Sequence, residues 1–350
     1  MVRFALGSNV RIIAIAMRTG IFCNYENYHQ DAHRAITEQV AMVKHCENLG
    51  FDDAWVTEHH FNEFNLSPSI LVLMAHLAGV TSKIRLGSAA VLLAFHNPIR
   101  VAEDIATLDH LSGGRLAFGI AKGGPFPEHN RHFATPMGES RAKALEAMTL
   151  IHKLLYETDV SFQGNYYHCD RITIYPKPLQ KQIPVYIASG DDEGITFAAK
   201  HSFSLMGGPP FSLERLKTTV AKYRSLNSSG SEKLMLARFF FVGKTYEQAV
   251  SEALPFIRKF SQKMQANAAV VMQNHGNQHQ KPFDRHNICF EEDYLIENSI
   301  IGDVATCRDK IKRFQDELNI DALAFKPSAF DWQQNLESLT RYNQEVRSYV

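Results

Sequence analysis

Short apolar runs alternate along the chain with longer segments in which apolar residues recur every three or four positions. The short runs are predicted strands, at residues 51–57, 84–93, 115–121, 184–189, 203–207, 234–242 and 321–325. The longer segments have the period of amphipathic helices, as in the run SRAKALEAMTLIHKLLYE from Ser140. Repeated strand–helix units predict a parallel sheet covered by helices.

Two of the predicted helices begin at a polar residue followed by proline. Ser67-Pro68 and Asn97-Pro98 each offer an N-cap side chain before a proline at the first helical position, where the missing N–H is not needed. An early strand before residue 31 brings the predicted strands to eight. This number favours a closed (β/α)8 TIM barrel over an open doubly wound sheet.

Two segments interrupt the alternation. Residues 158–183, with QGNYY and YPKPL, are predicted to be an insertion of short strands or loop. Residues 262–292 are rich in Gln, Asn and His and lack a period of their own. A loop of that length is usually either a mobile lid or disordered, and the sequence leaves both open. The fold class expected is therefore α/β, a TIM barrel with insertions.

Composition removes several classes of function. Lys plus Arg equals Asp plus Glu at 37 each, so the chain lacks the positive charge of a nucleic-acid-binding protein. Hydrophobic residues make up 45% of the chain, enough for a large core, but no apolar stretch approaches the roughly 20 residues that cross a membrane. The run IIAIAM at 12–17 is too short for a secretory signal. Five scattered cysteines argue against a disulfide framework and favour the cytoplasm.

The candidate chemistry begins with Glu58, His59 and His60, which follow a predicted strand. Carboxyl ends of barrel strands face the active site, and strand alternation places Glu58 and His60 on one side and His59 on the other. Imidazole suits acid–base catalysis because it titrates near neutral pH. Structural polar residues at a strand end or a subunit contact remain the alternative. A metal site is not expected, because the motif lacks the helical spacing of zinc ligands.

Four segments together resemble the bacterial luciferase family of flavin-dependent monooxygenases. They are EHHFNEFNL at 58–66, LGSAAVLLAFHNPIRVAEDIATLDHLSGGRLAFGIAKG at 86–123, SRAKALEAM at 140–148 and PVYIASG at 184–190. The resemblance begins near Met17, where MRTGIF looks like the opening of family members. It implies a single barrel domain at 17–350 after an N-terminal extension at 1–16. A first strand at 12–17 is the competing interpretation.

The resemblance implies an enzyme that uses reduced flavin mononucleotide (FMN) and dioxygen to oxidise a small, apolar substrate such as an aldehyde. A separate flavin reductase would supply the reduced FMN, since no G-x-G-x-x-G fingerprint follows a predicted strand. It also implies a homodimer, or a heterodimer with a paralogous subunit, through the helix at 98–111, where Glu103 is a polar interface candidate. The segment 262–292 stands at the position of the family's mobile lid.

Two alternatives stay open at this point. One is a flavin-dependent or deazaflavin-dependent dehydrogenase on the same barrel, which transfers hydride without oxygen. The other is a catalytically inactive flavin-binding subunit. Ala121 stands where luciferases themselves have a reactive cysteine, so light emission is in doubt while flavin binding is not.

The resemblance also assigns roles to residues. His59 matches a general base, His60 an orienting or interface residue, and Glu58 an anchor for either histidine. Ala89-Ala90 matches a non-prolyl cis peptide beneath the flavin ring.

The expected phosphate contacts lie after two other strands. Lys122 stands where relatives carry arginine, and it supplies charge without the two-pronged geometry of a guanidinium. Gly123 leaves room for backbone amides, and Ser189 and Gly190 precede a helix whose N-terminus can bind an anion. Asp191 is a weaker expected contact.

The stretch GGPFPEHNRHF from Gly123 is expected either to line the substrate mouth or to be a solvated loop. Its side chains that could contact a substrate are Phe126, His129, Arg131, His132 and Phe133.

Overall fold

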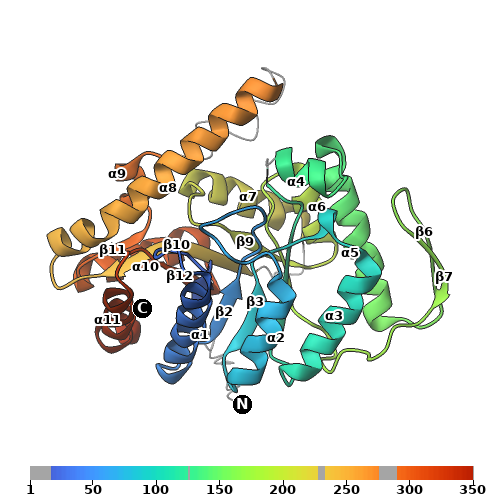
Figure 1. Cartoon of the computed structure of the whole chain (residues 1–350), viewed down its shortest axis with the longest axis horizontal. Helices are drawn as coiled ribbons and strands as arrows, with labels where there is room; N and C mark the ends of the chain where they lie inside the picture. Colours follow the sequence, from blue (N-terminus) through green and yellow to red (C-terminus); the bar gives the residue numbers. More distant parts are fainter. Residues whose placement is uncertain (1–16, 125–126, 228–232, 276–289, 350) are drawn as a thin grey trace, which may run out of the picture.

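Eight parallel strands form a closed barrel in the computed structural model, which describes residues 17–124, 127–227, 233–275 and 290–349 (Figure 1). The barrel strands follow chain order: β1 (Arg18–Cys23), β2 (Asp53–Val56), β3 (Arg85–Ser88), β5 (Leu116–Ala121), β8 (Val185–Ile187), β9 (Ser204–Gly207), β10 (Leu234–Val242) and β12 (Ala322–Pro327). Closure comes from the pairing of β12 with β1 and of β10 with both β9 and β12. The predicted TIM barrel is confirmed.

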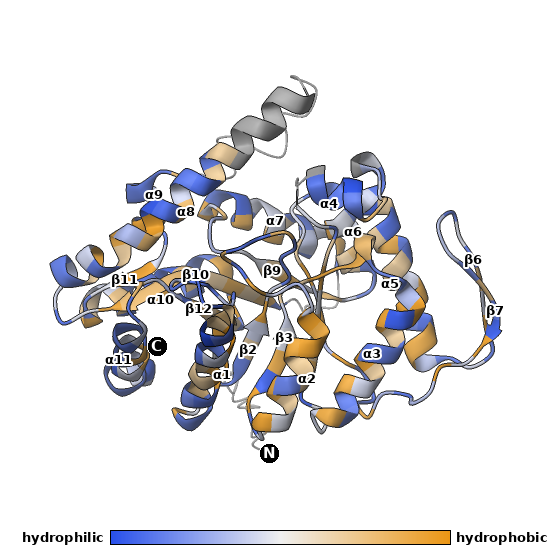
Figure 2. Cartoon of the chain, in the orientation of Figure 1, coloured by the Kyte–Doolittle hydropathy of each residue, from blue (hydrophilic) through white to orange (hydrophobic). Residues whose placement is uncertain are grey.

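Helices surround the barrel. They are α1 (Ala32–Asn48), α2 (Ile70–Val80), α3 (Pro98–Leu111), α4 (Pro127–His132), α5 (Ser140–Tyr156), α6 (Asp192–Lys200), α7 (Leu213–Leu226), α8 (Tyr246–His275), α9 (Glu292–Glu297), α10 (Val304–Leu318) and α11 (Trp332–Arg341). Figure 2 shows α2 mainly in hydrophobic colours and α11 mainly in hydrophilic ones. Within the described ranges, no helix has both the length and the apolar character needed to span a membrane.

Of the two predicted helix starts, the one at Asn97 is confirmed and the one at Ser67 is not. Asn97 caps α3, accepting hydrogen bonds from the backbone N–H groups of Ile99 and Arg100 at 2.9 and 3.2 Å. Ser67 does not cap α2, which begins at Ile70 with Ser69 as its N-cap. The reason is that Ser67 is fully buried and its hydroxyl lies 3.2 Å from that of Thr57. The prediction for Ser67 is therefore wrong by two positions.

Other predicted segments change in detail. The strand predicted at 84–93 is divided into β3 and β4 (Val91–Leu92) by a cis peptide between Ala89 and Ala90. β11 (Ile300–Gly302) adds a strand beside β10 that the sequence pattern did not indicate. Residues 158–183 contain an antiparallel hairpin outside the barrel, β6 (Val160–Gln163) and β7 (His168–Ile172), as the predicted insertion of short strands requires.

The ends of the predicted segments are only partly described. β1 starts at Arg18, and the competing strand at 12–17 lies almost wholly outside the described residues. α8 occupies the first part of the predicted lid, through His275, and residues 276–289 lie outside the described chain. The lid therefore stays a prediction.

The barrel interior contains mostly small side chains packed around a few large ones. Trp55 and Tyr186 are buried there with their rings 4.9 Å apart, edge to face. The small side chains around them are those of Ala90, Ala117, Ala237, Ala322 and Ala324. A Cβ added to Gly87 would lie 2.2 Å from the Trp55 ring, so the ring fits only because that position is glycine. Because these alanine side chains are small, space remains at the carboxyl ends of β2, β3, β5 and β8. The candidate site lies there.

Candidate active site

A buried carboxylate lies at the carboxyl end of β2. The Glu58 side chain is 0% exposed, and its Oε1 accepts hydrogen bonds from Nε2 of His60 at 2.6 Å and Nε2 of His96 at 2.7 Å. Its Oε2 accepts a third from the Leu92 backbone N–H at 3.0 Å. The predicted placement of Glu58 and His60 on the same side is confirmed by their contact.

These contacts determine the charge of the Glu58 cluster. Burial acts to raise the pKa of Glu58, but the hydrogen bonds from His60 and His96 outweigh it and the pKa is lowered. Burial acts to lower the pKa of His96, and the hydrogen bond and charge of Glu58 raise it overall. Glu58 is therefore ionised at neutral pH, and His96 is more readily protonated than a free histidine.

The same three side chains have the composition of a metal site, since their ligand atoms all lie within 4.8 Å of one another. Their distances fit a hydrogen-bond network better. Both imidazole nitrogens lie 2.6–2.7 Å from one carboxylate oxygen. Two ligand atoms of a tetrahedral zinc ion would lie about 3.3 Å apart. We therefore interpret the cluster as hydrogen-bonded.

His59 lies apart from this network. Its backbone N–H donates to the Ser67 carbonyl at 3.2 Å, while its ring has no hydrogen-bond partner within the part of the chain that the structure describes. Burial lowers its pKa to about 4, with further lowering by Lys263 and Lys326. The ring is therefore neutral at pH 7, and its nitrogens are available to a bound molecule.

An aromatic group packs on His60. Phe133 lies 4.7 Å from the His60 ring, centroid to centroid, and stacks on Phe95 at 5.3 Å. His129 donates from Nε2 to the His60 carbonyl at 3.1 Å. Two of the side chains expected at the substrate mouth, Phe133 and His129, thus contact His60, the neighbour of the candidate base His59.

Of the other expected substrate-mouth residues, His132 also contacts the loop that contains His60, with its ring 5.3 Å from that of Phe61, centroid to centroid. Arg131 forms an exposed ion pair with Glu128, and His132 is exposed beside it. Phe126 lies outside the described residues.

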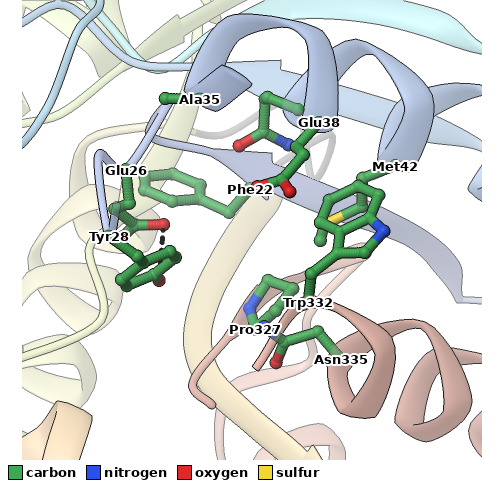
Figure 3. Close-up of a pocket in the computed structure, with 10 residues that line it drawn as sticks. Phe22, Glu26, Tyr28, Ala35, Glu38, Met42, Pro327, Trp332 and Asn335 are labelled. Atoms are coloured by element: carbon green, nitrogen blue, oxygen red, sulfur yellow. Dashed lines mark hydrogen bonds between the residues drawn. The ribbon is translucent and has the colours of Figure 1, made fainter. Parts of the chain in front are cut away.

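A buried ion pair lies at the carboxyl end of β12. Lys326 is 3% exposed and pairs with Glu26 of the loop after β1. Glu26 also accepts a hydrogen bond from the Tyr28 hydroxyl at 3.1 Å, drawn in Figure 3. Glu26 and Tyr28 line a cavity of about 30 Å³ between α1 and α11, which suits a water molecule rather than a flavin.

Three cationic side chains gather around the loop between β8 and α6. Arg141 pairs with Asp191, and its side chain is only 13% exposed. A Cβ at Gly190 would lie 2.5 Å from Nη2 of Arg215, so this guanidinium packs against the glycine backbone. Lys122, after β5, is half-buried; burial and the nearby Arg141 lower its pKa. Asp191 and Glu193 act in the opposite direction on the pKa of Lys122, so the three cations outnumber these two carboxylates.

The expected phosphate contacts are only partly free to bind an anion. Asp191 is the N-cap of α6 and accepts the Gly194 N–H at 2.9 Å, so its carboxylate is already engaged by the helix and by Arg141. Ser189 is buried and Gly190 lies beside Arg215. Gly123 has φ +94°, and a Cβ there would lie 2.7 Å from the Phe95 ring. Both the backbone conformation and the packing against Phe95 thus require a glycine at position 123.

The expected cis peptide is present at Ala89-Ala90, where the Ala89 N–H donates to the Val56 carbonyl at 2.6 Å. Ala89, Ala121 and Ala188 are partly buried at the ends of their strands. Backbone and methyl groups therefore form the surface on which a flat ring could lie.

The family model for the luciferase-like monooxygenases matches residues 17–318. The chain belongs to this family. It is therefore an oxidoreductase, a luciferase-like flavin-dependent monooxygenase. The oxygenase component of the flavin-dependent trigonelline monooxygenase of Acinetobacter baylyi is 28% identical over 244 residues, which cover 67% of each chain. Other curated relatives match over about half of their own length.

Solved structures share the fold of this luciferase-like chain. The oxygenating constituent of 3,6-diketocamphane monooxygenase from Pseudomonas putida, in complex with FMN, has a TM-score of 0.78 at 17% identity over 96% of this chain and 99% of its own. An F420-dependent secondary alcohol dehydrogenase has a TM-score of 0.74 at 19% identity, over 96% of this chain and 99% of its own. At these identities the likeness concerns the fold alone.

Four residues of the site were missed from the sequence: His96, Arg141, Arg215 and Lys326. Each carries a weak local signal. His96 directly precedes the Asn97-Pro98 helix start, and Lys326 directly follows a predicted strand. Arg141 and Arg215 stand in the first turn of a predicted helix, where a side chain lies near the barrel mouth.

Proposed function

We propose that this luciferase-like chain is the oxygenase of a two-component system. It binds reduced FMN from a separate flavin reductase and uses dioxygen to oxidise a small, apolar aldehyde to a carboxylic acid. The arrangement that supports this most directly is the group of Lys122, Arg141 and Arg215 at the mouth of the barrel, with the Ala89-Ala90 peptide and the imidazoles that follow β2 and β4.

The residues present suit a flavin phosphate. Gly190 has no side chain to separate its backbone from Arg215, and the N-terminus of α6 adds its partial positive charge. Arg141 and Arg215 provide the planar donors that Lys122 lacks. The lysine in place of the family's arginine is thus accompanied by two guanidinium groups.

The bound reduced flavin supplies the two electrons of the reaction. One atom of dioxygen enters the acid, the other leaves as water, and the aldehyde C–H is lost as a proton. The neutral ring of His59 can accept that proton at its unpartnered nitrogen. Phe95 and Phe133 offer an apolar surface for the substrate and reduce the access of water to it.

The phosphate contact is tested with Arg215→Gln. We expect about a 10-fold weaker affinity for FMN, the range of one lost charged hydrogen bond, and an unchanged affinity for riboflavin, which has no phosphate. Arg171→Gln, on the exposed hairpin, is the matched control and should leave both affinities unchanged. Equal effects of Arg215→Gln on FMN and riboflavin would count against this phosphate site.

The oxygenation is tested by anaerobic titration with reduced FMN, followed by an aldehyde and ¹⁸O-labelled dioxygen. One labelled oxygen atom in the carboxylic acid supports the proposal. Oxidation without oxygen, using oxidised flavin or a deazaflavin, would instead indicate a dehydrogenase, whose fold this chain also shares. Flavin binding without turnover of any aldehyde would indicate an inactive subunit.

A further inference from the structure

His96 connects two parts of the site that come from different strands. We propose that His96 is a positioning residue, which, by donating to Glu58, fixes the cis Ala89-Ala90 segment relative to His59. This inference rests on the proposed function, in which the cis segment supports the flavin and His59 accepts a proton. His96 lies after the short helical turn Leu93–Phe95, just before α3.

The Glu58 carboxylate is the link. Glu58 precedes His59 at the end of β2, and Leu92 lies two residues beyond Ala90 in β4. One carboxylate oxygen contacts both imidazoles and the other contacts the Leu92 N–H. Rotation of the carboxylate would therefore break hydrogen bonds that join the His59 loop to the segment after the cis peptide.

The two imidazoles differ in what they join. His60 stands two residues from Glu58, so their contact is local to one loop. His96 stands 38 residues away, beyond β4, and its contact with Glu58 joins separate parts of the barrel rim. The two bonds to Oε1 orient the carboxylate so that Oε2 faces Leu92. Loss of His96 would leave a fully buried carboxylate with two of its three donors, a state that favours rotation or proton uptake.

The test compares His96→Leu, which removes the donor, with His96→Gln, whose amide N–H can still reach Glu58. His110→Leu is the matched control, because His110 lies in α3 and its Nε2 donates to the Lys177 carbonyl at 2.8 Å, away from the site. The measurements are kcat and KM for the aldehyde, the affinity for reduced FMN, and backbone hydrogen exchange of residues 89–95.

We expect His96→Leu to lower kcat by about 10- to 100-fold with KM changed less than about 3-fold, because a displacement near 1 Å mainly affects the reacting geometry. Exchange of residues 89–95 should become faster. His96→Gln should recover most of both properties, and His110→Leu should match the wild type.

Two results would overturn the inference: wild-type kcat and exchange in His96→Leu, or a His96→Gln variant as impaired as His96→Leu. A wild-type protein that binds no flavin would refute the proposed function instead. The exchange of residues 89–95 in the three variants would then still decide whether His96 positions this segment.

Discussion

Single residues in the barrel interior stand where no side chain fits. A Cβ at Gly119 would lie 1.9 Å from the Ser88 carbonyl oxygen, and Ser88 Oγ is hydrogen-bonded at 2.8 Å to both the N–H and the carbonyl of Gly119. Because this contact is with the backbone of the neighbouring strand, we expect Gly119→Ala to lower the free energy of unfolding by about 3 kcal/mol.

The control for Gly119 is Gly79, in α2, where a Cβ would meet nothing within 4 Å. Gly79→Ala should leave the free energy of unfolding unchanged or raise it by about 0.5–1 kcal/mol, because alanine favours the helix. Denaturant unfolding of both variants is the measurement. Equal effects of the two substitutions would show that the Ser88 contact does not limit position 119.

Asp53, at the amino end of the barrel, gives a pH-dependent prediction. Burial raises its pKa to about 6, although Arg18 and Arg85 act to lower it. The folded state therefore binds the proton more tightly than the unfolded chain, whose aspartate pKa is about 3.9. This contribution to stability is complete below about pH 4 and is lost as the pH rises through about 6. Unfolding of the wild type and Asp53→Asn from pH 4 to 7 should show the wild type losing up to about 3 kcal/mol relative to the variant. A difference in the free energy of unfolding between the two proteins that stays constant with pH would contradict this prediction.

The residues of the site show what a sequence can reveal at this scale. Glu58, His59 and His60 were found because they are consecutive and follow a strand. His96 and Arg215 were not, since each acquires its role only when barrel closure brings it to a partner distant in sequence. Asp191 was a weaker expected cofactor contact, and in the structure its carboxylate caps α6. The local sequence pattern identifies candidate site residues, whereas tertiary packing determines which residues they contact.

At the scale of elements, the β6–β7 hairpin is attached to α5 through one carboxylate. Glu146 accepts backbone N–H groups of Asn165, Tyr166 and Tyr167 at 2.8–2.9 Å. We expect Glu146→Ala to accelerate hydrogen exchange at residues 164–167 about 10-fold or more, because three donors lose their acceptor. Exchange of the β1 and β12 amides in the same sample is the control. Equal acceleration there would mean that Glu146 supports the whole fold.

Element boundaries were less predictable than element types. The period-two and helical patterns gave the strands and most helices, because burial on one face is a local property of the sequence. The start of α2 was wrong because Ser67 is held in the loop after β2 by Thr57, a contact that sequence spacing does not reveal. β11 was missed because two isoleucines and a glycine are too few to distinguish from the start of α10.

At the scale of the whole molecule, the first strand closes the barrel by pairing with the last one, β12. The Arg18 N–H donates to the Asp321 carbonyl at 2.9 Å, and the Arg18 side chain contacts Asp321 at 3.0 Å and the Tyr186 hydroxyl at 2.9 Å. Arg18 thus joins β1 to β12 and reaches β8 through the interior. The match to the family begins at residue 17, one position earlier.

We therefore expect a chain that begins at Met17 to keep its melting temperature within about 2 °C and its affinity for FMN. A chain in which an initiator methionine precedes Gly20 lacks Arg18 and leaves the buried Asp53 without its nearer cation, 3.6 Å away. That loss should lower the free energy of unfolding by about 3–5 kcal/mol. Thermal and denaturant unfolding of both shortened chains separate the two cases. Equal destabilisation by both deletions would mean that residues 1–16 take part in the fold, and would refute their assignment as an extension.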